Sequence, residues 1–377
     1  MQNNKLLFQS ILLGCILEGL SFLLSNSLQG ASNYSCQFIG LSIDPFAKGQ
    51  PQQYRFLIPL IGFLTGLKGN NYYIMSLIGN TFFLIMVNYW ASKFYQNRLT
   101  AFLLASCMAC LPVVLLNNSW YAWSDVYCYA FLLLALLYPK FCPLIIFLGL
   151  SSHEFFGMYF PFICLYYYRY HHHCFEDKKI VIKIMVGLLI AFASYGLIRW
   201  WFTSHSAPAL SIAYYIYMLP NRGLFCELRG QPLLAGLITA YKTSIILFVP
   251  FIYFALRYIK SKMLDILLLL SALIPLSLLF IAHDTTRFFS HTFIFILFFP
   301  KYIQQFRNSL LAFILISSIL IPSFVIAFVS LNEIYFLTLN LKDDEFSKIL
   351  NSADEKRNFI FSAPGSSVQS YFHFYTN

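Results

Sequence analysis

Charged residues are scarce in this chain, and their scarcity excludes a soluble domain. Only 11% of the 377 residues are Asp, Glu, Lys or Arg, whereas 59% are hydrophobic, and the mean hydropathy is +0.67. A compact soluble core has no room for so much apolar surface, so the chain is expected to use lipid as its solvent. Residues 1–25 also lack a small-residue cleavage site, which predicts a retained first helix and no signal peptide.

Long apolar runs predict membrane-spanning helices. A spanning helix needs roughly 20 apolar residues, and runs near that length occupy 6–24, 71–91, 99–117, 124–139, 181–202, 233–256, 263–282 and 309–331. Shorter apolar runs occupy 55–67, 142–152, 155–168 and 288–300. Length alone does not decide whether these short runs cross the membrane.

Acidic residues are fewer than basic ones, 15 against 25, and the positions of the basic ones orient the chain. Short cytoplasmic loops retain Lys and Arg. That rule is met if 142–152 and 155–168 are two short spans that meet outside, and if 55–67 is re-entrant or interfacial. The basic residues then placed inside are Lys5, Lys93, Arg98, Lys140, Arg169, Lys178, Lys179, Lys183, Arg257, Lys260, Lys262, Lys301 and Arg307.

These constraints predict an all-α polytopic membrane helix bundle of about eleven transmembrane helices plus the segment 55–67. Residues 1–331 form the transmembrane domain, with outer loops at 26–54 and 203–232, and 332–377 form a short extracytoplasmic tail. The N-terminus lies in the cytoplasm and the C-terminus outside the cytoplasmic (inner) membrane. The net charge of +10 is then an orientation signal, and no nucleic-acid partner is implied.

Cysteine patterns typical of metal or redox sites are missing. Most of the nine cysteines lie in apolar runs, and Cys107 and Cys110 form a mid-span C-x-x-C without a second pair. Such cysteines are typical of small buried side chains and not of zinc or redox work. Cys36 and Cys226 fall in outer loops, where an oxidising compartment permits a disulfide. Whether they pair is left open.

Acidic residues of the apolar body fall at the outer ends of successive segments: Asp44, Asp125, Glu154 and Asp284. Asp44 precedes Pro45, and a proline holds the residue before it extended. Asp44 is therefore a turn former, a general base or a metal-binding carboxylate at the membrane surface. If Asp44 binds a metal, the cofactor is a divalent metal ion. No other metal ligands are predicted from the sequence.

Arginines on the same side have two interpretations each. Arg55 opens an apolar segment, so it either snorkels to the interface or binds a lipid phosphate through its planar fork. Arg287 stands three residues after Asp284, so the two share a helical face and either pair with each other or bind substrate together. In the second case Arg287 engages a phosphate and Asp284 orients it.

Aromatic and ionisable residues mark two further outer positions. Trp120 and Trp123 precede Asp125, and they are either belt aromatics or a platform for a sugar beside a carboxylate, while Asp125 alternatively caps its helix. His153 and Glu154 lie between two short apolar runs. Because ionisable groups at such depth are expensive, this pair is a candidate functional site.

The order of these outer-face elements resembles that of bacterial multi-pass proteins related to the GT-C glycosyltransferases. The resemblance covers roughly residues 1–300. It rests on five elements in this order: an Asp in the first long loop, a Tyr-Arg-x-Leu-x-Pro segment, an Asp opening a later span, a His-Glu pair at a short hairpin, and Asp-x-Thr-Arg before a late span. In this chain the matching elements are Asp44, Tyr54 to Pro59, Asp125, His153 with Glu154, and Asp284 to Arg287.

This resemblance implies a GT-C-like fold and a transferase that passes a sugar from a polyprenyl-phosphate donor to a glycan, lipid or protein outside the cytoplasm. Asp44 would then activate the acceptor hydroxyl, with Asp125 and Glu154 as further candidate catalytic carboxylates. The predicted substrate-binding residues are Tyr54, Arg55, Trp120, Trp123, His153, Asp284 and Arg287. The chain departs from the family pattern in having Pro45 beside Asp44 and only a short tail.

Two other functions remain open at this stage. A polymerase of lipid-linked oligosaccharides would use the outer arginines with little need for Asp44. A transporter or flippase of lipid-linked substrates would place ionisable groups near the middle of the membrane. Glu18, Arg199 and Lys242 are the intramembrane charges available for that role, although Glu18 and Lys242 alternatively pair within the bundle.

Overall fold

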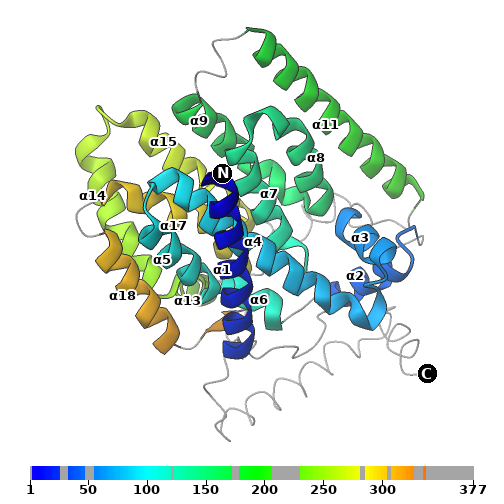
Figure 1. Cartoon of the computed structure of the whole chain (residues 1–377), viewed down its shortest axis with the longest axis horizontal. Coiled ribbons are helices and arrows are strands. Elements are labelled where there is room, and N and C mark those ends of the chain that lie inside the picture. Colours follow the sequence, from blue (N-terminus) through cyan, green and yellow to red (C-terminus); the bar gives the residue numbers. More distant parts are fainter. Residues whose placement is uncertain are drawn as a thin grey trace, which may run out of the picture.

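The computed structural model describes residues 2–25, 33–46, 55–119, 123–171, 178–205, 230–280, 285–303, 307–321, 323–326 and 334–336. Within these ranges the elements are helices, apart from one short pair of strands (Figure 1). The first half contains α1 (Gln2–Leu24), α2 (Asn33–Ile43), α3 (Leu57–Thr65), η1 (Gly69–Tyr72), α4 (Tyr73–Tyr95), α5 (Arg98–Ala109), α6 (Pro112–Ser119), α7 (Asp125–Leu137), η2 (Pro139–Phe141), α8 (Cys142–Ser152), η3 (Glu154–Tyr159) and α9 (Phe160–Tyr170). The second half contains α11 (Lys178–His205), α13 (Gly230–Tyr241), η5 (Lys242–Leu247), α14 (Phe248–Tyr258), α15 (Met263–Ser271), η6 (Ile274–Phe280), α16 (Thr285–Ser290), α17 (Phe293–Phe298), η7 (Phe299–Tyr302), α18 (Arg307–Leu320), β1 (Phe324–Ile326) and β2 (Ile334–Phe336).

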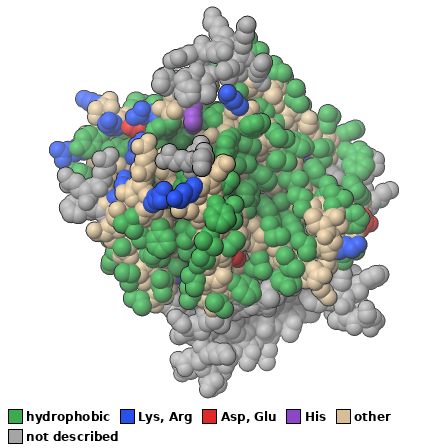
Figure 2. Space-filling model, in the orientation of Figure 1, with side chains coloured by type: hydrophobic (Ala, Val, Ile, Leu, Met, Phe, Trp, Pro, Cys, Tyr) green, Lys and Arg blue, Asp and Glu red, His purple; other side chains and the backbone are tan. Residues whose placement is uncertain are grey.

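Several helices have the length and composition of membrane spans. Four described segments qualify, namely Asn4–Leu24, Gly69–Tyr95, Ile184–Trp201 and Gly236–Tyr258, and the bent pair α5–α6 makes a fifth if it is one span. α7, the segment Pro139–Ser152 and α18 are apolar but shorter. On the face drawn in Figure 2 most of the surface is hydrophobic, with Lys and Arg side chains gathered toward one edge. A helical membrane protein is therefore confirmed at this level.

The core forms around α4 and α7, which pack against each other, while α1 and α5 cover α4. Close approach of α4 to α7 depends on Gly79, because an added Cβ there would lie 2.7 Å from the side chains of Val126 and Tyr127. The Tyr127 hydroxyl also donates to the Met75 carbonyl at 2.6 Å. These contacts fix the N-terminal end of α7 relative to α4.

Three expected continuous spans are interrupted. The expected helix 99–117 bends by 42° between α5 and α6, because Pro112 lacks the N–H that a continuous helix would use. The expected helix 233–256 passes through the 3-10 turn η5, which opens at Lys242 with φ 46°. Expected span 263–282 likewise changes from α15 to the 3-10 helix η6.

The expected helix 309–331 is wrong in its second half. α18 ends at Leu320, and β1 pairs antiparallel with β2 in the register Phe324 with Phe336. Pro322 in the sequence cannot continue a helix, and the Phe-Val-Ile and Ile-Tyr-Phe segments are rich in strand-forming residues. The ladder joins a segment expected in the membrane domain to one expected in the tail.

Candidate functional site

Four charged side chains from distant parts of the sequence form two ion pairs at the N-terminal end of α7. Arg55, just before α3, donates through Nε to Glu154 Oε2 at 2.6 Å, and its Nη2 contacts Oε1 of the same carboxylate. Arg287 of α16 donates to Asp125 Oδ2 at 2.5 Å and to Oδ1 at 2.8 Å. Both pairs are two-pronged, the geometry in which arginine binds carboxylates most strongly.

His153 joins the two pairs and is fully buried. Its Nδ1 accepts the Phe155 backbone N–H at 3.2 Å, so the proton of the neutral ring is on Nε2. Nε2 lies 3.0 Å from Asp125 Oδ1 and 3.1 Å from Arg287 Nη2. Since a guanidinium only donates, Nε2–H donates to the Asp125 carboxylate, and the contact with Arg287 is not a hydrogen bond in this tautomer. We call Arg55, Asp125, His153, Glu154 and Arg287 the charge cluster.

Burial and neighbouring charge set the protonation of the hairpin residues between α8 and α9. Burial acts to raise the pKa of the Glu154 carboxyl, but the charges of Arg55 and His153 and the hydrogen bonds to the carboxylate together outweigh it and hold that pKa at about 2. For His153, burial and the charge of Arg55 both lower the pKa. Near neutral pH Glu154 is thus ionised and His153 neutral, and a carboxylate of such low pKa is a poor general base.

Trp123 is part of this site and not of a lipid-facing belt. The residue is buried, and the Arg287 guanidinium carbon lies 4.0 Å from the centre of its ring. A cation over an indole face at this distance is a stabilising arrangement. One face of the ring is therefore occupied by Arg287, which leaves that face unsuited to stack on a sugar.

The charge cluster and the main basic residues lie at opposite ends of α7. Near the C-terminal end of α7, Lys93 lies over the rings of Tyr89 and Tyr138. In the same region Arg169 Nε pairs with Asp265 Oδ1 at 2.9 Å, and the Lys301 ammonium donates to the Tyr170 hydroxyl at 2.7 Å. The asymmetry expected from the sequence is thus present among the described residues.

α11 runs past the charge cluster. It packs against α8, and its Tyr195 is close enough to feel the charges of Arg55 and Glu154. Trp200 and Trp201 follow on the same helix with 66% and 47% of their surface exposed. Five residues of helix correspond to about 8 Å, so these tryptophans lie one to two turns beyond Tyr195 along α11.

Other predicted site residues are not brought into the cluster by any described contact. Asp44 is exposed, and its Oδ1 accepts the Phe46 backbone N–H at 3.1 Å, which is the turn-forming role. Tyr54, Trp120 and Asp284 lie outside the described residues. The expected pairing of Arg287 with Asp284 is therefore untested, and the described partner of Arg287 is Asp125.

The described residues bear only partly on the expected Cys36–Cys226 disulfide and on the expected divalent metal ion. Cys226 lies outside the described residues, as does the side chain of Cys36, so their pairing stays a prediction. Within the described ranges no three His, Cys, Asp or Glu side chains are placed to hold a metal ion. Arginines also engage both carboxylates of the cluster, so the described residues do not fit a divalent metal.

One site residue was missed in the sequence. His291 is fully buried and its ring centre lies 6.1 Å from that of His153. Its backbone carbonyl accepts the Tyr159 hydroxyl at 2.7 Å, which ties α16 to η3. The spacing of four residues between Arg287 and His291 was the available signal, because such residues share a helical face.

No protein-family model, curated protein or solved structure matches the chain. The site is therefore interpreted from its own geometry.

Proposed function

We propose that the chain is a GT-C-like membrane glycosyltransferase that moves a sugar from a polyprenyl-phosphate donor to a glycan, lipid or protein acceptor outside the cytoplasm. The observation that carries the proposal is the charge cluster, in which two arginines from distant segments converge within an apolar bundle. An eleven-span topology in the inner membrane, with a cytoplasmic N-terminus and an extracytoplasmic C-terminus, belongs to the same proposal.

Roles within the site follow from the pairing. Asp125 and Glu154 hold the guanidinium groups of Arg287 and Arg55 in fixed orientations, and they act as positioning residues. The two pairs are neutral overall, so a departing lipid phosphate would be stabilised by N–H groups of Arg55 and Arg287 in a site drier than water and not by a net positive charge. Asp44 is exposed after α2 and is the carboxylate that we assign to accept the proton of an acceptor hydroxyl.

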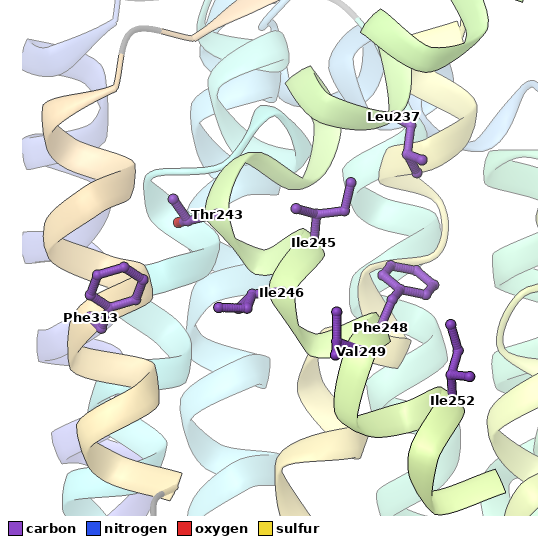
Figure 3. A pocket seen from close by; sticks show the side chains of 8 residues that line it. All are labelled: Leu237, Thr243, Ile245, Ile246, Phe248, Val249, Ile252 and Phe313. Atoms are coloured by element: carbon purple, nitrogen blue, oxygen red, sulfur yellow. The ribbon is translucent and has the colours of Figure 1, made fainter. Parts of the chain in front are cut away.

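An apolar groove supports a binding place for the lipid chain of the donor. The groove has a volume of about 730 Å³ and is lined by Leu237, Thr243, Ile245, Ile246, Phe248, Val249, Ile252 and Phe313 (Figure 3). It lies along the candidate span Gly236–Tyr258. The same helix approaches the charge cluster, because Thr239 bonds to Thr286 at 2.9 Å, next to Arg287. We therefore place the polyprenyl chain here.

The test is transfer by membrane vesicles that contain the chain. Vesicles are supplied with a panel of polyprenyl-monophosphate sugars together with glycan, lipid and peptide acceptors, and the polyprenyl phosphate released on transfer is measured. Asp44→Asn keeps the size of the side chain and removes the proton-accepting charge, so release should fall by about 10²-fold or more. Lys68→Gln, an exposed charge change between α3 and η1, serves as the control and should retain release.

Groove occupancy is tested in the same assay. Val249→Trp fills the groove and should raise the donor concentration needed for half-maximal release, whereas Leu256→Trp on the same helix should not. Both positions are exposed, at 68% and 77%, but only Val249 lines the groove. Near-normal release by Asp44→Asn would refute its role as the base. No release from any donor by the parent chain would overturn the transferase proposal in favour of the polymerase or the transporter.

A further inference from the structure

A further buried carboxyl group, on α1, has no ion pair with any cationic side chain among the described residues. Glu18 of α1 is 5% exposed and receives Asn80 Nδ2 on Oε1 at 3.2 Å. The network continues from Asn80 to Asn118 Oδ1 at 2.9 Å and from Asn118 to Ser21 Oγ at 3.2 Å. Asn117 donates to Asn80 Oδ1 at 3.3 Å. We call these five residues the asparagine network.

The asparagine network is attached to the break between α5 and α6. A helix break releases backbone carbonyls, and inside a membrane each of them needs another donor. Ser21 Oγ donates to the Ala109 carbonyl at 2.9 Å, and Lys242 Nζ donates to the Cys110 carbonyl at 3.1 Å. Glu18 and Lys242 therefore do not pair, as had been one expectation. They contribute to two different sets of bonds at the same break.

The second Glu18 oxygen is the unusual feature. Oε2 is buried and has no hydrogen-bond partner, and among the described residues no cationic side chain forms an ion pair with Glu18. The elements packed on α1 are α4, α5 and α6. Their ionisable groups near the break are the Cys107 and Cys110 thiols, and Lys242 reaches the break from η5. None of these places a positive charge on the carboxyl group.

An ionised carboxylate without a cationic partner is very costly in an apolar interior. Lys242 is already placed at the ends of two helices, because its Nζ also donates to the Ser318 carbonyl near the end of α18 at 2.6 Å. A cation at helix C-termini is stabilised there by the helix dipoles. The positive charge of Lys242 is therefore committed to the carbonyls, and Glu18 must be neutralised in another way.

We infer that Glu18 is an intramembrane proton-binding site, which holds its proton as a neutral carboxylic acid between α1, α4 and α6. A proton neutralises Oε2 without requiring room in a position that is fully covered, whereas a metal ion would need several more oxygen ligands. Buried ionisable groups of this kind form proton relays in membrane proteins. The inference rests on contacts separate from the charge cluster and does not depend on the proposed transferase activity.

Reaction with dicyclohexylcarbodiimide tests the inference on the full-length protein in lipid vesicles. This apolar reagent takes the proton of a protonated carboxyl group on its nitrogen, and the carboxyl oxygen attacks its carbon to form an acylisourea that rearranges to a stable acylurea. Mass spectrometry of the cleaved protein should locate the adduct on Glu18 at neutral pH. Labelling should fall as the pH is raised and should be absent in Glu18→Gln.

Internal and ionic controls make the test decisive. Asp125 and Glu154, which are bound by arginines, should be labelled at least tenfold less than Glu18. Replacing choline chloride by sodium chloride at constant pH should leave the labelling unchanged, and protection by sodium would overturn the proton site in favour of a metal cation. Infrared difference spectra between the parent and Glu18→Gln should show a protonated carboxyl band. Absence of that band would also overturn the inference, whether or not the reagent reaches the site.

Discussion

Two buried carboxylate sites in this chain use opposite kinds of partners. In the charge cluster, Asp125 and Glu154 are each bound by both prongs of an arginine. In the asparagine network, Glu18 is bound by a neutral amide. The arginines keep their carboxylates ionised, whereas the amides stabilise a carboxyl group without supplying the charge that ionisation requires. Burial alone therefore does not decide the protonation of an acid, because the charge of its partner does.

Changing an acid to its amide should have very different effects on stability at the two carboxylate sites. Asp125→Asn leaves the guanidinium of Arg287 without its counter-charge in a site where its side chain is only 12% exposed. Removing one partner of a buried pair costs about 3–5 kcal/mol. Glu18→Gln, in contrast, should change stability by less than about 1 kcal/mol, the scale of one hydrogen bond.

Unfolding of the purified protein in detergent measures both effects. A variant that combines Asp125→Asn with Arg287→Met should lose less than the sum of the two single losses, because the two residues share one interaction. Equal losses for Asp125→Asn and Glu18→Gln would contradict the distinction between the two carboxylate sites.

Side-chain packing next to the charge cluster leads to a second prediction, with a smaller expected loss of stability. A Cβ added at Gly149 of α8 would lie 2.4 Å from the ring of Phe156, whereas one added at Gly19 of α1 would meet nothing within 4 Å. Overpacking of this kind costs about 1–3 kcal/mol, so Gly149→Ala should lower the melting temperature and Gly19→Ala should not. If both variants melt like the parent, the hairpin that carries His153 and Glu154 is less tightly packed than described.

Acid should weaken the charge cluster in two steps. The pKa of His153 is lowered in the folded protein, so the unfolded chain takes up a proton first as the pH falls below about 6.5. The contribution of neutral His153 to the free energy of unfolding is therefore fully present above that pH. Below it, the free energy of unfolding decreases by at most about 1.4 kcal/mol per pH unit for this one proton. The pKa of Glu154 is about 2, so its contribution is present above about 4.3 and is lost as the pH falls toward 2.

Unfolding followed at a series of pH values measures these steps. His153→Gln should remove the step that begins near pH 6.5 and retain the one at lower pH, where Glu154 is protonated. A parent protein whose stability is the same at pH 7 and pH 5 would contradict the assignment of a neutral, buried His153.

The sequence predicted the helical membrane class, because apolar length is a local property. It also predicted that Arg55, Asp125, Glu154 and Arg287 lie at the same ends of their segments, and the structure brings these four side chains together. Which arginine binds which acid was not predicted, since the pairs join residues 99 and 162 positions apart.

Local rules also favoured partners that are close in sequence or simply opposite in charge. They offered Asp284 as one partner for Arg287, and a bond between Glu18 and Lys242 as one alternative. The second choice failed because released carbonyls at the α5–α6 break compete for the lysine, and that break becomes evident only when the bend at Pro112 is seen. His291 was overlooked because a buried histidine has no distinctive pattern in a chain of apolar runs.

The short helices that carry the charge cluster have a consequence for the surrounding bilayer. α7 has 13 residues and the helical segment Pro139–Ser152 has 14, which correspond to roughly 20 Å each, whereas a hydrocarbon core is roughly 30 Å thick. If these two segments cross the membrane as proposed, the mismatch would be met by local thinning of the bilayer or by water above the His153–Glu154 hairpin. A hydrated depression at that point would allow a water-soluble molecule and a lipid to reach the same depth from different sides.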